Sequence, residues 1–125
     1  YTIFLLISSM SYLSAQKEVT EQFMRFVTSG DHQAISRLCG DFVEIETDKY
    51  EESTSKSQVS FILKDFFSTH PPQLFEYSHI GTSPGGAQYA IATYFSKEGK
   101  EFLVIVKFKI LEKKLLIDTI KFTPE

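Results

Sequence analysis

The residues best suited to acid–base chemistry lie on two stretches with alternating side-chain character. Tyr77 and His79 are two positions apart on an expected strand, so their side chains are predicted to point to the same face. A phenol and an imidazole in one cavity can act as an acid–base pair where their surroundings shift their pKa values. Asp118 falls among apolar residues of a second expected strand, where an unpaired carboxyl would have a raised pKa. These three residues are the catalytic candidates.

Each candidate also has a purely structural explanation. His79, close to Gly81 at a strand end, suits a hydrogen bond that stabilises a turn. Tyr77 suits a core aromatic whose hydroxyl reaches the rim of the core. Asp118 suits an exposed position on an edge strand, or an ion pair with a neighbouring lysine. The spacing of the residues does not decide between these explanations, and we favour the structural ones.

The remaining reactive residues form no metal or cofactor motif. His32, His70 and His79 do not have the three- or four-residue spacing of helical metal ligands. The single cysteine, Cys39, excludes an internal disulfide and the usual multi-cysteine zinc sites, and it suits a buried thiol. Residues 83–86 read as a turn, because no lysine and helix follow as in a phosphate loop. We therefore expect no metal and no cofactor.

Composition limits the partners. The chain has 125 residues, and 16 acidic against 13 basic side chains give a net charge of −3. This length suits one domain, and a hydrophobic content of 42% is that of a globular protein. A mildly acidic chain without a basic block is a poor candidate for binding nucleic acid or anionic lipid through charge. We expect no nucleic-acid partner.

The first fifteen residues resemble an export signal. Residues 1–15 contain no charged side chain, and the apolar run 3–7 is followed by serine-rich sequence and the small residue Ala15. The apolar stretch is too short for a membrane-spanning helix. We expect cleavage before Gln16, a mature domain over residues 16–125 without a membrane span, and a periplasmic or secreted location.

Helical periodicity appears in three places. Apolar residues at positions 19, 23, 26 and 27 predict a helix that Gly30 ends. Asp31 is placed to cap a second short helix that closes at Gly40. Ser55 begins a capping box before the strongest apolar stripe of the chain. That stripe consists of Val59, Ile62, Leu63, Phe66 and Phe67.

The rest of the chain alternates with the two-residue period of strands. A strand over 42–46 with a short return at 50–52 precedes the long helix, which the two prolines at 71 and 72 end. Four strands follow, over 74–80, 88–95, 102–111 and 115–123, joined by turns at Gly or Lys-rich positions. Helices followed by an antiparallel meander predict an α+β fold.

This order of elements resembles the cystatin-like cone of the nuclear transport factor 2-like superfamily over 16–125. More narrowly, the sequence is similar to an exported Gram-negative bacterial family of unknown function. The residues that carry this likeness are Gly30–Asp31, 42–45, 62–67 with Pro71–Pro72, 79–83 and 89–91. The resemblance implies N-terminal helices and one long helix in the concave face of a curved antiparallel sheet, and pairing as a homodimer through the sheet.

Two functions follow from the resemblance and the residues. The favoured one is a non-catalytic module that binds a small apolar ligand or a protein, with Tyr77, His79, Tyr94 and Phe66 as ligand-binding candidates. The alternative is a small hydrolase or isomerase whose active site lies in the cone, since enzymes of this superfamily use Asp, His or Tyr there. An enzyme requires a cavity of at least about 300 Å³ that holds His79 and a second titratable group.

Overall fold

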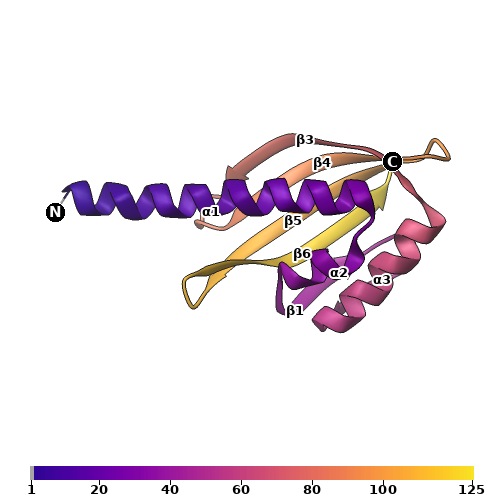
Figure 1. Cartoon of the computed structure of the whole chain (residues 1–125), viewed down its shortest axis with the longest axis horizontal. Helices are drawn as coiled ribbons and strands as arrows, with labels where there is room; N and C mark the ends of the chain where they lie inside the picture. The colour runs from indigo at the N-terminus through magenta and orange to yellow at the C-terminus, as the bar shows by residue number, and fades with distance from the viewer. Residues whose placement is uncertain (1) are drawn as a thin grey trace.

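A computed structural model describes residues 2–125, with side chains from Ala15 onward. Three helices lie on one side of a six-stranded curved sheet (Figure 1). The predicted export segment, residues 1–15, lies almost wholly outside the described side chains and stays a prediction. Among the residues that the structure describes, no helix is long and apolar enough to cross a membrane.

The two N-terminal helices begin and end largely as their sequence signals predict. Helix α1 (Thr2–Ser29) ends at Gly30, whose φ of +69° suits a glycine after a helix. The Asp31 carboxylate accepts a hydrogen bond of 3.0 Å from the Ala34 amide and caps α2 (His32–Arg37). The prediction that Gly40 closes α2 is wrong. The helix ends at Leu38, and Gly40 already belongs to the first strand.

Helix α3 (Lys56–Thr69) carries the predicted apolar stripe into the core. The Ser55 hydroxyl accepts from the Gln58 amide at its start, and the chain leaves the helix at His70, directly before Pro71. All five stripe residues, Val59, Ile62, Leu63, Phe66 and Phe67, are buried. The helix therefore packs in the concave side of the sheet, as predicted.

The sheet has the strand order β2-β1-β6-β5-β4-β3. Its strands are β1 (Cys39–Glu46), β2 (Glu51–Thr54), β3 (Pro72–Thr82), β4 (Gln88–Ser96), β5 (Glu101–Leu111) and β6 (Lys114–Pro124). The predicted antiparallel meander is β3 to β6. The sequence did not predict how the β1–β2 pair joins this meander: β1 pairs with β6 in parallel and makes the sheet mixed.

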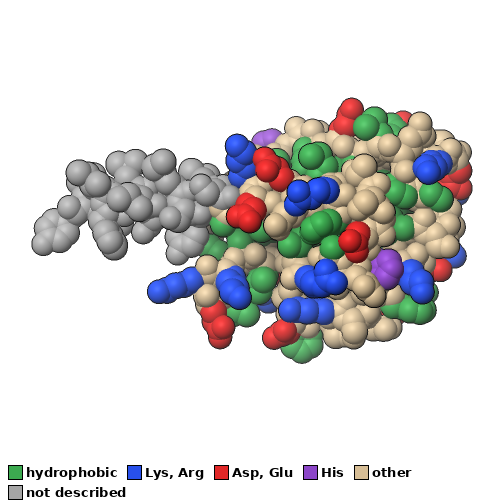
Figure 2. Space-filling view, viewed as in Figure 1, with side chains coloured by type: hydrophobic (Ala, Val, Ile, Leu, Met, Phe, Trp, Pro, Cys, Tyr) green, Lys and Arg blue, Asp and Glu red, His purple; other side chains and the backbone are tan. Residues whose placement is uncertain are grey.

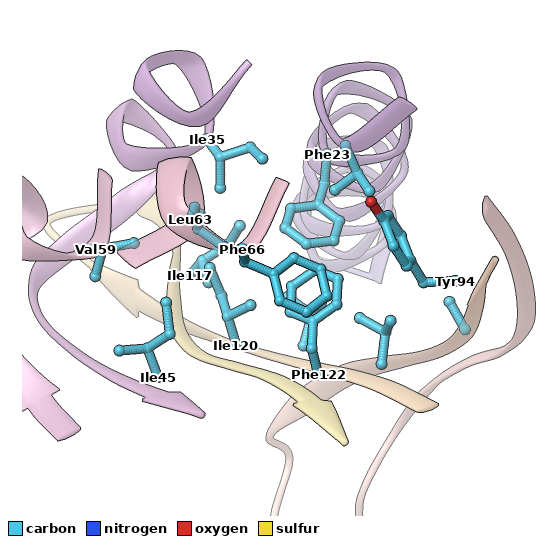
Figure 3. Packing of buried hydrophobic residues seen from close by; sticks show 14 of the residues in the cluster. Phe23, Ile35, Ile45, Val59, Leu63, Phe66, Tyr94, Ile117, Ile120 and Phe122 are labelled. Carbon is cyan, nitrogen blue, oxygen red and sulfur yellow. The ribbon is translucent and has the colours of Figure 1, made fainter. Parts of the chain in front are cut away.

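The inside of the cone is filled by aromatic rings (Figure 3). The Phe66 ring centre lies 4.5 Å from that of Phe122, 5.0 Å from that of Phe102 and 5.4 Å from that of Tyr94. Each of these four side chains is at most 2% exposed. The face of the sheet that meets the helices, called the inner face below, is therefore a packed core. Within residues 2–125, no helix covers the opposite, outer face.

Candidate functional site

The structure separates Tyr77 and His79, which the sequence placed on one face. Tyr77 pairs with Ala92, a buried residue of the inner face, whereas His79 pairs with Ile91 of the outer face. The shift in register between these pairs is a β-bulge, in which one strand has an extra residue. Because an extra residue reverses the alternation of side chains, the two groups point to opposite faces. The predicted shared cavity for the phenol and the imidazole is wrong.

Both side chains have structural hydrogen bonds. The Tyr77 hydroxyl donates to the Thr20 carbonyl oxygen at 2.6 Å and so ties β3 to α1, while burial raises the pKa of the phenol. The His79 side chain is exposed, and its Nε2 lies 2.9 Å from the Tyr89 hydroxyl oxygen. Neither group faces a cavity that the other lines.

Tyr94 and Phe66, the other ligand-binding candidates, lie in the core. The Tyr94 hydroxyl donates to the His70 carbonyl oxygen at 2.5 Å. Burial raises the pKa of this phenol, and the negative charge of Glu98 raises it further. With exposed fractions of 0% and 2%, neither ring has surface available to a ligand.

Asp118 is the extra residue of a second bulge. Lys107 pairs with Thr119 and Phe108 with Ile117, so Asp118 has no direct partner on β5. Its side chain is half-buried, and β6 lies between β1 and β5, so the alternative of an exposed position on an edge strand is wrong. Its Oδ1 accepts a hydrogen bond of 3.1 Å from the Thr119 hydroxyl.

Four hollows of about 280 to 540 Å³ lie in the described part of the molecule. None of the four is lined by Tyr77, His79, Asp118, Tyr94 or Phe66. A cavity with His79 and a second titratable group was the condition for an active site, and none of these hollows meets it.

The structure brings together a different set of ionisable groups at one end of the cone. His70 follows α3, and its side chain is 3% exposed. Each of its ring nitrogens contacts a carboxylate oxygen. Nε2 is 2.8 Å from Oδ2 of Asp48 in the β1–β2 turn, and Nδ1 contacts Oε1 of Glu98 in the β4–β5 turn. These three residues are called the His70 cluster below.

Aromatic rings and the backbone hold the imidazole in place. The Phe66 and Phe102 ring centres are 5.2 Å and 4.9 Å from that of His70, and Tyr94 binds its carbonyl oxygen. The Asp48 carboxylate also borders a surface hollow of about 540 Å³ with Phe102. The arrangement places one imidazole between two carboxylates from separate turns. Within the described residues, no group of three His, Cys, Asp or Glu side chains is arranged to hold a metal ion.

The sequence analysis missed the His70 cluster. Its members are 22 and 28 residues apart, and two of them lie in turns, where no periodicity fixes the direction of a side chain. The only local feature of His70 in the sequence was its position directly before Pro71. That position indicated extended backbone, but it did not indicate which side chains would contact the imidazole.

The cluster predicts a pH dependence of stability on the acid side. The hydrogen bond from His70, helped by the charge of His70 and Lys100, holds the pKa of Glu98 below its ordinary value. A lowered pKa in the folded state gives a contribution to stability that is present above the unfolded value of about 4.3 and is lost as pH falls below it. We expect the stability difference between wild type and Glu98→Gln, measured by urea denaturation, to shrink over this range. Replacing the exposed Glu52 by Gln should leave the wild-type profile unchanged, and a constant difference for Glu98→Gln would contradict the assignment.

Residues 20–123 match the model of a domain of unknown function, DUF4783. The chain belongs to the DUF4783 family. No curated protein matches the chain.

Solved structures of DUF4783 proteins have the same fold. A Bacteroides uniformis protein is 20% identical with a TM-score of 0.76, over 84% of this chain and 95% of that one. A Bacteroides fragilis protein is 22% identical with a TM-score of 0.74, over 83% and 96% of the two chains. A nuclear transport factor 2-like protein of unknown function from Silicibacter pomeroyi is 13% identical with a TM-score of 0.65, over 94% and 98%. The predicted nuclear transport factor 2-like fold is therefore confirmed, and at these identities the likeness concerns the fold alone.

Proposed function

We propose that this DUF4783 domain is an exported, non-catalytic module that binds a protein through the outer face of its sheet, and that the protein is a second copy of the chain. The observation that carries this proposal is a continuous apolar patch on β3, β4 and β5. Cross-strand pairing puts Ile91 beside Ile105 and Leu74 beside Phe95 on that face. The outer patch comprises Leu74, Ile91, Phe95, Leu103 and Ile105, none of which is buried.

The surroundings of the outer patch suit a protein interface. Beyond Ile105, the same face carries charged side chains. They are Lys107 of β5, Lys121 of β6, and Glu44 and Glu46 of β1. An apolar centre with a charged border is the usual anatomy of such an interface. Leu74 is 46% exposed and the other four side chains of the outer patch are half-buried, so apolar surface remains there for a partner to cover.

Other binding modes have less support. The aromatic core fills the volume that a small apolar ligand would need inside the cone. No observation favours the hydrolase or isomerase alternative, because the candidate acid–base pair is divided between two faces. On the side that carries the helices, basic and acidic side chains are interspersed (Figure 2), which does not suit nucleic acid.

The proposed export rests on the N-terminal sequence. Residues 1–15 carry no charge, and the family match begins only at residue 20. Cleavage before Gln16 would leave the whole matched domain in a periplasmic or secreted protein. The intact mass of protein recovered after export is expected to correspond to residues 16–125.

The oligomeric state of the exported protein tests the interface. Analytical ultracentrifugation is expected to give the mass of a dimer for wild type and of a monomer for Ile105→Asp, since a buried unpaired carboxylate is costly. Ile110→Asp is the matched control, because Ile110 lies on the same strand, 47% exposed, near the hairpin tip and outside the outer patch. A wild-type monomer at all concentrations, or dissociation by the control alone, would overturn the proposal.

A further inference from the structure

We propose that the His70 cluster is a proton-operated clamp that holds the β1–β2 turn against the end of the cone and releases it when His70 loses one proton. This inference does not depend on the proposed function, because the cluster and the outer patch lie on different parts of the domain. It rests on the position of one buried imidazole between two carboxylates from separate turns.

When both carboxyl groups are ionised, only one protonation state of the ring satisfies both contacts. A carboxylate accepts hydrogen bonds, so each ring nitrogen of His70 must carry a proton to bind Asp48 and Glu98 together, which makes the ring an imidazolium cation. Neutral imidazole has one N–H and one lone pair. Loss of a proton therefore leaves one carboxylate without a donor and turns a lone pair toward it. The aromatic rings beside His70 offer no donor in its place, so the partly exposed carboxylate is left to solvent and no longer ties its turn to the ring.

The charged groups around the ring are few. Besides the two carboxylates, Lys100 lies close enough to Glu98 for its positive charge to lower the pKa of the Glu98 carboxyl. The exposed pair of Lys49 and Asp65, 3.7 Å apart, joins the β1–β2 turn to α3 nearby. The remaining groups packed against His70 are the Phe66 and Phe102 rings, and the Tyr94 hydroxyl is already bound to its backbone.

The two turns are not equally secured. The β4–β5 turn has a backbone tie to the segment after α3, because the Lys97 amide donates to the Pro71 carbonyl oxygen at 2.8 Å. Apart from the His70–Asp48 contact and the exposed Lys49–Asp65 pair, the described hydrogen bonds of the β1–β2 turn are internal ones between Thr47 and residues 49 and 50. After proton loss, the ring is expected to keep Glu98 and to release Asp48. The surface hollow lined by Asp48 and Phe102 then widens at the end of the cone.

Two measurements on the exported wild-type protein test this clamp. Two-dimensional ¹H–¹⁵N spectra of the imidazoles are expected to show both His70 nitrogens protonated at low pH and a single loss as pH rises. Over the same range, hydrogen exchange should show the protection factor of the Thr47 amide falling by about 10- to 100-fold, the value of one hydrogen bond to a charged group. The Lys97 amide should keep its protection.

Variants separate the clamp from general effects of pH. In His70→Gln the protection of Thr47 should no longer change with pH, whereas His79→Gln, which alters an exposed histidine, should behave as wild type. The proposal would be overturned if the His70 ring carried a single proton at every pH. A protection factor of the Thr47 amide that stays constant with pH would also overturn it, and so would a loss of protection at the Lys97 amide in place of Thr47. The wild-type spectra and exchange data decide the question even if His70→Gln does not fold.

Discussion

Replacing Phe66 by alanine is expected to lower the free energy of unfolding by about 3–5 kcal/mol, the cost of a large cavity in a packed core. The Phe66 ring lies within 5.4 Å, centre to centre, of the rings of Phe122, Phe102 and Tyr94, which come from three different strands. These neighbours cannot all move inward to fill the space, since each is held by its own strand. Urea denaturation followed by circular dichroism measures the loss.

Phe61→Ala is the matched control for this prediction. Phe61 lies on the same helix, five positions earlier, and is 57% exposed. Its replacement removes the same atoms from α3 but leaves no internal cavity, so the expected change is about 0.5 kcal/mol or less. Equal losses for the two variants would show that α3 does not pack in the concave face as described.

Replacing His70 by alanine is expected to cost about 2–4 kcal/mol near neutral pH, because the change leaves two carboxylates facing a vacated, largely apolar space. This expected loss in the free energy of unfolding is smaller than the loss for a fully buried ion pair. The Asp48 and Glu98 side chains are 27% and 38% exposed, so water screens part of their charge. Denaturation by urea of this variant and of His79→Ala gives the comparison. The exposed His79 should change stability by less than about 1 kcal/mol.

The same His70 substitution, made in a variant that lacks both carboxylates, identifies why the loss of His70 lowers stability. With Asp48→Asn and Glu98→Gln already present, the loss of His70 should cost markedly less, because no carboxylate is left without a donor. An unchanged cost would mean that packing against Phe66 and Phe102, and not charge, accounts for the effect.

The helices and the meander could be predicted because their signals are local. The stripe from Val59 to Phe67 has the helical period, and the two prolines that follow cannot continue it. The pairing of β1 with β6 could not be predicted, since it joins residues more than 70 positions apart and no turn fixes its register. The bulge beside His79 was also invisible, because one extra residue leaves no mark in the alternation of polar and apolar types.

The predicted site of Tyr77 and His79 was wrong for the same reason, because the sequence did not reveal the bulge. Placing Tyr77 and His79 together assumed an uninterrupted strand, and one inserted residue moved the imidazole to the other side of the sheet. The cluster that does form draws Asp48 and Glu98 from turns, where side-chain direction depends on the finished tertiary structure. The sequence can therefore indicate which residues titrate, and the fold decides which of them meet.

The place of β6 in the sheet has a consequence for biosynthesis. The last strand of the chain lies between β1 and β5 and joins the two strands made first to the rest of the sheet. During translation, β1 and β2 have no partner on that side until β6 has left the ribosome. The nascent polypeptide consequently cannot complete this sheet before β6 is synthesised, and a chain that stops short of β6 loses the element that unites both halves of the domain.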